Sequence, residues 1–141
     1  MLRSFLIGSR DQAVAVDAGL LILRLGIGIT MALGHGLGKL PPSEGFVENT
    51  AALGFPAPVV FAWLAALAEF GGGLLIAFGL LTRPAALALA FTMGVAFFGQ
   101  HGADPFAERE LAFVYGVASL ALLASGAGRF SFDARLRRRW L

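Results

Sequence analysis

The chain has 141 residues, of which 57% are hydrophobic and only 14% are charged, and its mean hydropathy is +0.77. Soluble domains carry about 25% charged residues, so this composition indicates a single membrane domain of all-α class. There is no Cys, which excludes disulfides, CxxC redox chemistry and thiolate metal sites.

Four apolar segments predict a four-helix transmembrane bundle. They cover about residues 18–38, 59–81, 85–100 and 105–125, with Asp17 as the expected N-cap of the first helix. The third segment is short against the roughly 20 residues that a span needs. A buried core helix of a soluble protein is the alternative, but four such runs leave too little polar sequence to cover them.

The first apolar segment has a competing interpretation as a cleaved signal peptide. Ala32-Leu33-Gly34 is a small-x-small sequence after an apolar stretch. Arg24 in the middle of that stretch argues against cleavage, because the apolar core of a signal peptide is uncharged.

The connection 41–57 predicts a short amphipathic helix in the first outer loop. Ser43 and Glu44 are typical of a helix start, and Gly54 followed by Pro56 is typical of a stop. We expect this helix to lie over the outer mouth of the bundle. A plain interfacial linker is the alternative.

The distribution of basic residues predicts the topology. The net charge is only +2, but a cytoplasmic N-terminus collects nearly all Arg on the inner side, which is the favoured arrangement. These residues are Arg3, Arg10, Arg83, Arg129, Arg135, Arg137, Arg138 and Arg139. Both termini are then cytoplasmic. The basic tail 129–141 mixes Arg with aromatic residues and is expected to lie on an anionic leaflet; nucleic acid is not needed to explain it.

Two ionisable residues interrupt the apolar runs. Arg24 lies in the first segment and Glu69 in the second, where charges are costly and usually face a protein interior or each other. An Arg24–Glu69 ion pair fits the depths estimated from a rise of about 1.5 Å per residue. The pair could take part in chemistry or only fix the register of the helices.

Further polar residues are expected at the outer end of the bundle. Arg24, His35 and Lys39 share one face of the first helix, and His101 and Glu110 belong to the third connection and the fourth helix. We predict a ligand-binding or polar core formed by Arg24, His35, Lys39, Glu69, His101 and Glu110. The alternative for the outer residues is an ordinary interfacial rim. No His or Glu pair shows metal-ligand spacing, so no metal is assigned.

Several short motifs, in this order and spacing, resemble the DoxX family of small bacterial membrane proteins over nearly the whole chain. They are Arg24, His35-Gly36-Leu37-Gly38-Lys39, Leu53-Gly54-Phe55-Pro56, Ala68-Glu69-Phe70-Gly71-Gly72-Gly73, Gly79-Leu80-Leu81-Thr82-Arg83 and Gly126-Ala127-Gly128-Arg129-Phe130-Ser131-Phe132-Asp133. The resemblance implies a four-helix bundle in the bacterial cytoplasmic membrane. It also implies relatives associated with thiosulfate:quinone oxidoreduction or with membrane oxidoreductases in redox defence.

Two hypotheses about function follow. In the first, the polar core binds a quinone or another small amphipathic molecule and serves a membrane oxidoreductase, whose partner subunit supplies the electrons. In the second, the chain is a non-catalytic membrane module that recruits or stabilises partners, a second copy of itself included. Fold alone does not decide between them.

Overall fold

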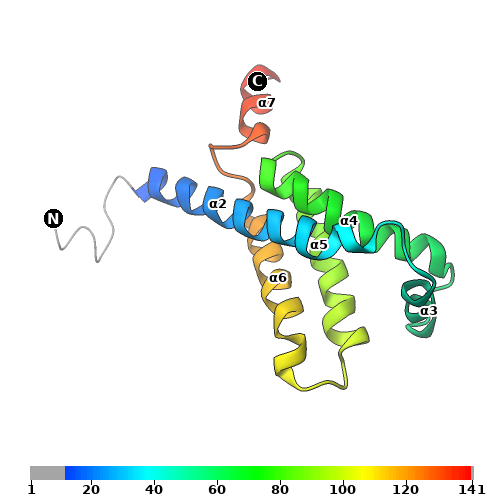
Figure 1. Cartoon of the computed structure of the whole chain (residues 1–141). Coiled ribbons are helices and arrows are strands. Elements are labelled where there is room, and N and C mark those ends of the chain that lie inside the picture. Colours follow the sequence, from blue (N-terminus) through cyan, green and yellow to red (C-terminus); the bar gives the residue numbers. More distant parts are fainter. Residues whose placement is uncertain (1–11, 141) are drawn as a thin grey trace.

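The computed structural model describes residues 12–140, and within that range the chain forms helices and connecting loops (Figure 1). The all-α prediction is confirmed. The elements are α2 (Gln12–Ile29) with a π-helical extension (Thr30–Gly36) and a 3₁₀ turn (Leu37–Lys39), α3 (Glu44–Ala52), α4 (Pro58–Phe78), α5 (Thr82–Gly94) with a π-helical extension (Val95–Gln100), α6 (Phe106–Ser125) and α7 (Phe132–Trp140). Arg3 and Arg10, which enter the topology prediction, lie outside the described residues.

Three of these helical stretches are long and apolar enough to cross a membrane. They are Ala13–Lys39, Pro58–Phe78 and Thr82–Gln100. The fourth predicted span exists as α6 but is not among them, and its first turns hold three charged residues, Glu108, Arg109 and Glu110.

The helices form two antiparallel pairs. Figure 1 shows α2 and α4 running along one another, while the hairpin of α5 and α6 crosses this pair. The hydrophobic core, which includes Met31, Ile76, Leu89 and Leu122, lies where the two pairs meet. A side-by-side four-helix transmembrane bundle therefore remains a prediction.

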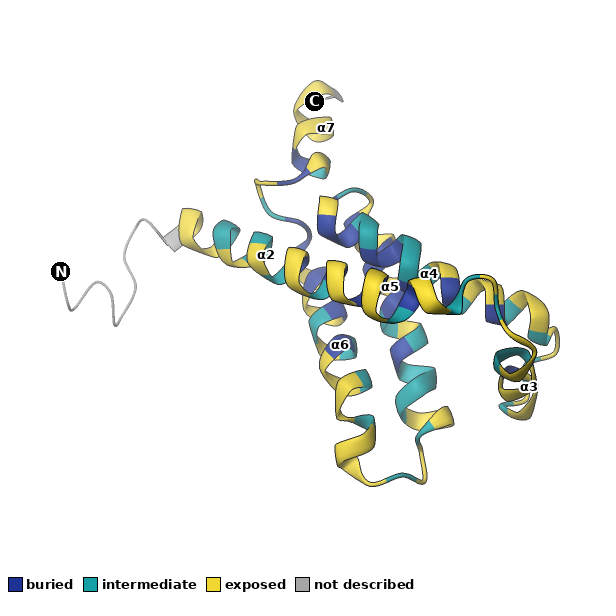
Figure 2. Cartoon of the chain, viewed as in Figure 1, coloured by how far each residue is buried: buried dark blue, intermediate teal, exposed yellow. Residues whose placement is uncertain are grey.

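Glycines bring α2 and α4 into backbone contact. A Cβ atom on Gly28 would lie 2.6 Å from the Gly73 carbonyl oxygen, and one on Gly73 would lie 2.8 Å from the Gly28 carbonyl oxygen. Such an approach is open only to small residues. The outer faces carry exposed apolar side chains such as Ile22 and Phe98, which are 72% and 78% exposed (Figure 2). This pattern suits a lipid environment.

The helix starts were predicted with mixed success. The helix predicted in the connection 41–57 is confirmed as α3, and the Ser43 hydroxyl caps it by accepting from the Phe46 N–H at 3.3 Å. The N-cap assigned to Asp17 is wrong, because α2 already begins at Gln12. The Asp17 carboxylate instead accepts from the Arg129 N–H at 2.9 Å, so it ties α2 to the C-terminal segment.

Candidate functional site

A cavity lies between α3, α4 and α5 and has a volume of about 480 Å³. Ligand sites commonly have volumes of about 300–1,000 Å³ with an apolar lining and a few polar groups. The apolar lining comes from Phe46, Leu53, Phe55, Phe61, Leu64, Ala65, Ala68, Ala88, Phe91, Val95 and Ala96. The short helix α3 therefore covers a cavity with the composition of a site for an amphipathic molecule.

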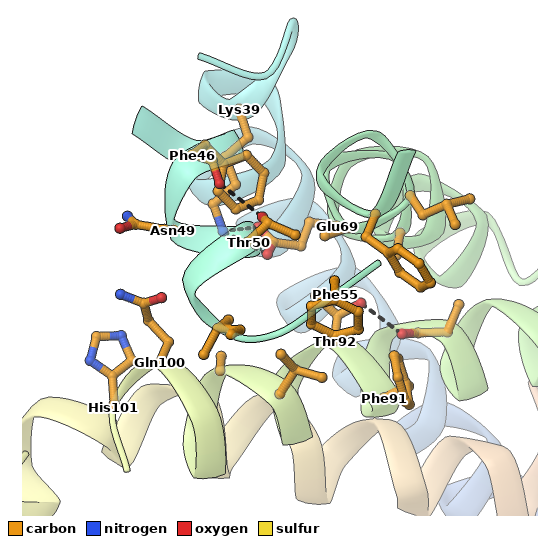
Figure 3. Close-up of a pocket in the computed structure, with 18 residues that line it drawn as sticks. Lys39, Phe46, Asn49, Thr50, Phe55, Glu69, Phe91, Thr92, Gln100 and His101 are labelled. Carbon is orange, nitrogen blue, oxygen red and sulfur yellow. Dashed lines mark hydrogen bonds and ion pairs between the residues drawn. The ribbon is translucent and has the colours of Figure 1, made fainter. Parts of the chain in front are cut away.

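An ion pair forms the polar wall of this cavity. The Lys39 Nζ contacts Glu69 Oε1 at 2.6 Å and Oε2 at 2.7 Å, and the Phe46 ring centre lies 5.4 Å from the same Nζ (Figure 3). The Glu69 side chain is 3% exposed, whereas that of Lys39 is 37% exposed. An ammonium group has three N–H donors, so Lys39 keeps donor capacity for a ligand while it neutralises the buried carboxylate.

A second set of polar side chains lies elsewhere on the cavity wall. Figure 3 shows Asn49, Gln100 and His101 on one side of the cavity. The His101 Nδ1 lies 2.8 Å from Asp104 Oδ2. An ionised carboxylate only accepts, so Nδ1 carries the proton, and Nε2 of the neutral ring is an acceptor. Within residues 12–140 no three His, Asp or Glu side chains gather as a metal site.

The predicted Arg24–Glu69 ion pair is wrong. Glu69 pairs with Lys39. Arg24 instead donates to two backbone oxygens in the last turn of α4 and to one in the C-terminal segment. Its Nη1 lies 3.1 Å from the Ala77 oxygen and 3.3 Å from the Ile76 oxygen, and its Nη2 lies 2.6 Å from the Phe130 oxygen. Arg24 thus caps the C-terminal carbonyls of α4, where a cation is favoured.

The remaining predicted site residues lie apart from the cavity lining. His35 packs edge-on against the Tyr115 ring, with ring centres 5.7 Å apart, and the Tyr115 hydroxyl donates to the Thr30 hydroxyl at 2.8 Å. Glu110 is exposed on α6. The structure therefore brings together Lys39, Glu69 and His101, and it leaves out Arg24, His35 and Glu110.

Sequence reasoning missed the polar residues that α3 contributes to this site. Asn49 and Thr50 line the cavity, although the Thr50 hydroxyl is already bonded to the Phe46 oxygen at 2.8 Å. The predicted amphipathic helix could have revealed them, because the apolar stripe of such a helix packs against the rest of the protein.

Comparison with known proteins finds a matching family and related inner-membrane proteins. The DoxX family model matches residues 19–102. "Inner membrane protein YphA" of Escherichia coli (strain K12) is 32% identical over 134 residues, which cover 89% of this chain and 95% of the relative. "Inner membrane protein YqjF" of the same organism is 35% identical over 134 residues, covering 88% and 96%. No solved structure matches.

Proposed function

This chain belongs to the DoxX family of membrane proteins, and from that premise we infer that it is a bacterial inner-membrane protein that binds a quinone-type amphipathic ligand. The proposed site is the cavity between α3, α4 and α5. The observation that carries the proposal is the ion pair between the partly exposed Lys39 and the buried Glu69, beside an apolar hollow of about 480 Å³.

The polar groups suit a ligand that has carbonyl oxygens on an apolar body. Lys39 donates to one oxygen, and Asn49 or Gln100 donates to another from a different part of the cavity wall. The aromatic side chains of Phe55, Phe61 and Phe91 pack against the ring and the tail. A few placed polar groups give such a pocket its selectivity.

A role in redox chemistry requires a second protein in this proposal. The ligand accepts or donates electrons at the site of a membrane oxidoreductase, and the DoxX-family chain holds the ligand near that partner. The alternative is a membrane module that binds partner proteins without any small ligand, in which the ion pair only stabilises the fold.

Native mass spectrometry and thermal unfolding test the proposal. The full chain is purified in dodecyl maltoside and titrated with ubiquinone-1 and menaquinone-1, and we expect a saturable mass shift and a higher melting temperature. Ala65→Leu adds three carbon atoms to the cavity lining without changing a charge, so it should weaken binding by at least about tenfold, since overfilling a packed site costs about 1–3 kcal/mol.

Ala121→Leu is the matched control, because Ala121 is exposed on α6 and does not line the cavity. It should bind as the wild type does. If the folded wild type binds neither quinone, or if both variants bind equally well, the ligand site is refuted and the partner-module alternative stands.

A further inference from the structure

A second, smaller hollow lies at the C-terminal end of α4, whereas the first cavity uses the N-terminal half of that helix. It encloses about 280 Å³. Its lining consists of Phe78, Arg129, Phe130, Ser131, Phe132 and Arg135. We call it the arginine recess.

The arginine recess has a positive lining. Two of its six residues are Arg and none is acidic. Asp17 Oδ2 lies 4.0 Å from the Arg129 Nε and offsets part of its charge, whereas no ion pair among the described residues involves Arg135. Both Asp133 oxygens accept from backbone N–H groups at 2.8 and 3.0 Å. Three further exposed arginines, Arg137, Arg138 and Arg139, follow on α7.

The two guanidinium groups suit an anionic partner that carries several acceptor oxygens. The Arg129 guanidinium carbon lies 5.7 Å from the Phe130 ring centre, and that of Arg135 lies 5.5 Å from the Phe132 ring centre. The aromatic rings hold both guanidinium groups in place. Arg presents a fork of donors that matches phosphate oxygens.

Apolar surface adjoins the positive lining. Phe78 is the last residue of a 21-residue helix that is long and apolar enough to cross a membrane, so its ring lies where hydrocarbon meets head groups. Phe78 is 58% exposed and packs edge-on against Phe132, with ring centres 6.4 Å apart. A ligand here meets arginines at one end and exposed rings at the other.

We propose that the arginine recess binds the phosphate group of an anionic phospholipid, with the acyl chains lying along Phe78 and Phe132. This site is separate from the cavity between α3, α4 and α5, and it does not depend on the ligand proposed there. It assigns the C-terminal segment a specific lipid contact rather than general attraction to a charged leaflet.

Lipid titration in detergent tests this proposal, because a micelle of neutral detergent lacks the negative surface potential of an anionic leaflet. The full chain in dodecyl maltoside is titrated with dioleoyl phosphatidylglycerol and, separately, with dioleoyl phosphatidylcholine, and bound lipid is counted by native mass spectrometry. We expect one phosphatidylglycerol to bind at least about tenfold more tightly than phosphatidylcholine, because the choline ammonium group brings a positive charge next to the arginines.

Two double variants with the same change in charge separate the recess from the rest of α7. Arg129→Gln with Arg135→Gln should lose at least about tenfold in affinity for phosphatidylglycerol, while Arg137→Gln with Arg138→Gln should stay within about twofold of the wild type, because neither residue lines the recess. Thermal unfolding checks that each variant is folded. If the first pair is unstable, Arg135→Gln alone replaces it, since the Arg135 side chain is exposed and its contact is with the Phe132 ring.

Three results would overturn the proposal. Equal losses in both double variants would show diffuse attraction without a site. Equal binding of the two lipids would show that the head-group charge is not recognised. Displacement of the bound lipid by millimolar sodium phosphate would show that the recess takes the free anion instead of a lipid.

Discussion

Lys39 and Glu69 lie 30 residues apart in the chain, and the Lys39 Nζ contacts both oxygens of the Glu69 carboxylate. The contact joins the 3₁₀ turn after α2 to the middle of α4 at the wall of the larger cavity. It also supplies the one countercharge that the buried Glu69 has among the described residues. The pair therefore bears on stability and on ligand binding together.

Removing Lys39 should destabilise the fold more than removing both partners. Lys39→Met leaves the Glu69 carboxylate, 3% exposed, without a cation, and we expect a loss of about 1–3 kcal/mol in the free energy of unfolding. The partial exposure of Lys39 keeps this below the range for fully buried pairs. Lys39→Met with Glu69→Met should recover part of the loss. Unfolding in detergent, followed by Trp fluorescence, measures Lys39→Met, Glu69→Met and the double variant. A double variant as unstable as the sum of the two singles would show that the pair does not interact.

Arg24 and Glu69 should behave as independent residues. Arg24→Gln removes the donors to the Ala77 and Phe130 oxygens, which should cost at least about 2 kcal/mol because the acceptors are left without a charged donor. Since Glu69 pairs with Lys39 instead, adding Glu69→Gln should produce losses that sum within about 0.5 kcal/mol. The same unfolding assay checks this. A strong coupling between the two substitutions would restore the ion pair that the sequence suggested.

The sequence was sufficient to identify the buried charges but not to pair them. Arg24 and Glu69 stand out because ionisable residues in apolar runs are costly, and both are indeed buried. The acceptors of Arg24 are backbone oxygens, which no sequence pattern displays. The depth estimate also assumed a regular α-helix, whereas Thr30–Lys39 continues α2 as π and 3₁₀ turns and changes where Lys39 points.

The larger cavity was beyond sequence reasoning for a related reason. The capping residue and the stop signal predicted α3, and the apolar segments predicted the longer helices. The cavity depends on how the α5–α6 hairpin crosses α2 and α4, which is set by packing between helices distant in the chain. His35 was selected by its type and its face, but the same packing places it against Tyr115 instead of in the cavity.

Asp133 should stabilise the start of α5. Its carboxylate accepts from the Leu81 and Thr82 N–H groups at 2.8 and 3.0 Å, and Leu81 has a left-handed backbone with φ of 49°. Asp133→Ala should cost about 1–2 kcal/mol, as the loss of a helix cap does. Glu110→Ala, on the exposed face of α6, is the control and should stay within about 0.5 kcal/mol of the wild type. Equal effects in the unfolding assay would argue against the cap.

Gly36 should tolerate no side chain, whereas Gly34 in the same π-helical stretch should accept one. A Cβ on Gly36 would collide with the backbone of Phe70 and lie 2.7 Å from the Glu69 carbonyl carbon, while nothing lies within 4 Å of a Cβ on Gly34. We expect Gly36→Ala to cost about 1–3 kcal/mol through overpacking, and Gly34→Ala to be neutral or stabilising by up to about 1 kcal/mol. Melting temperatures in detergent compare the two. Similar losses in both would mean that Gly36 is not needed for the close approach of the π-helical stretch Thr30–Gly36 to α4.

The topology predicted from the arginines can be tested by labelling single cysteines in this Cys-free chain. Glu48 and Ala103 are exposed in the two connections that we predict to be outside, and Arg138 is exposed on α7. A membrane-impermeant maleimide added to intact cells should label Glu48→Cys and Ala103→Cys and spare Arg138→Cys until the membrane is opened. Arg138 is a better site on the tail than Ala134, which is only 5% exposed and would resist labelling on either side. Labelling of Arg138→Cys alone in intact cells would reverse the orientation, and it would place the arginine recess on the outer leaflet.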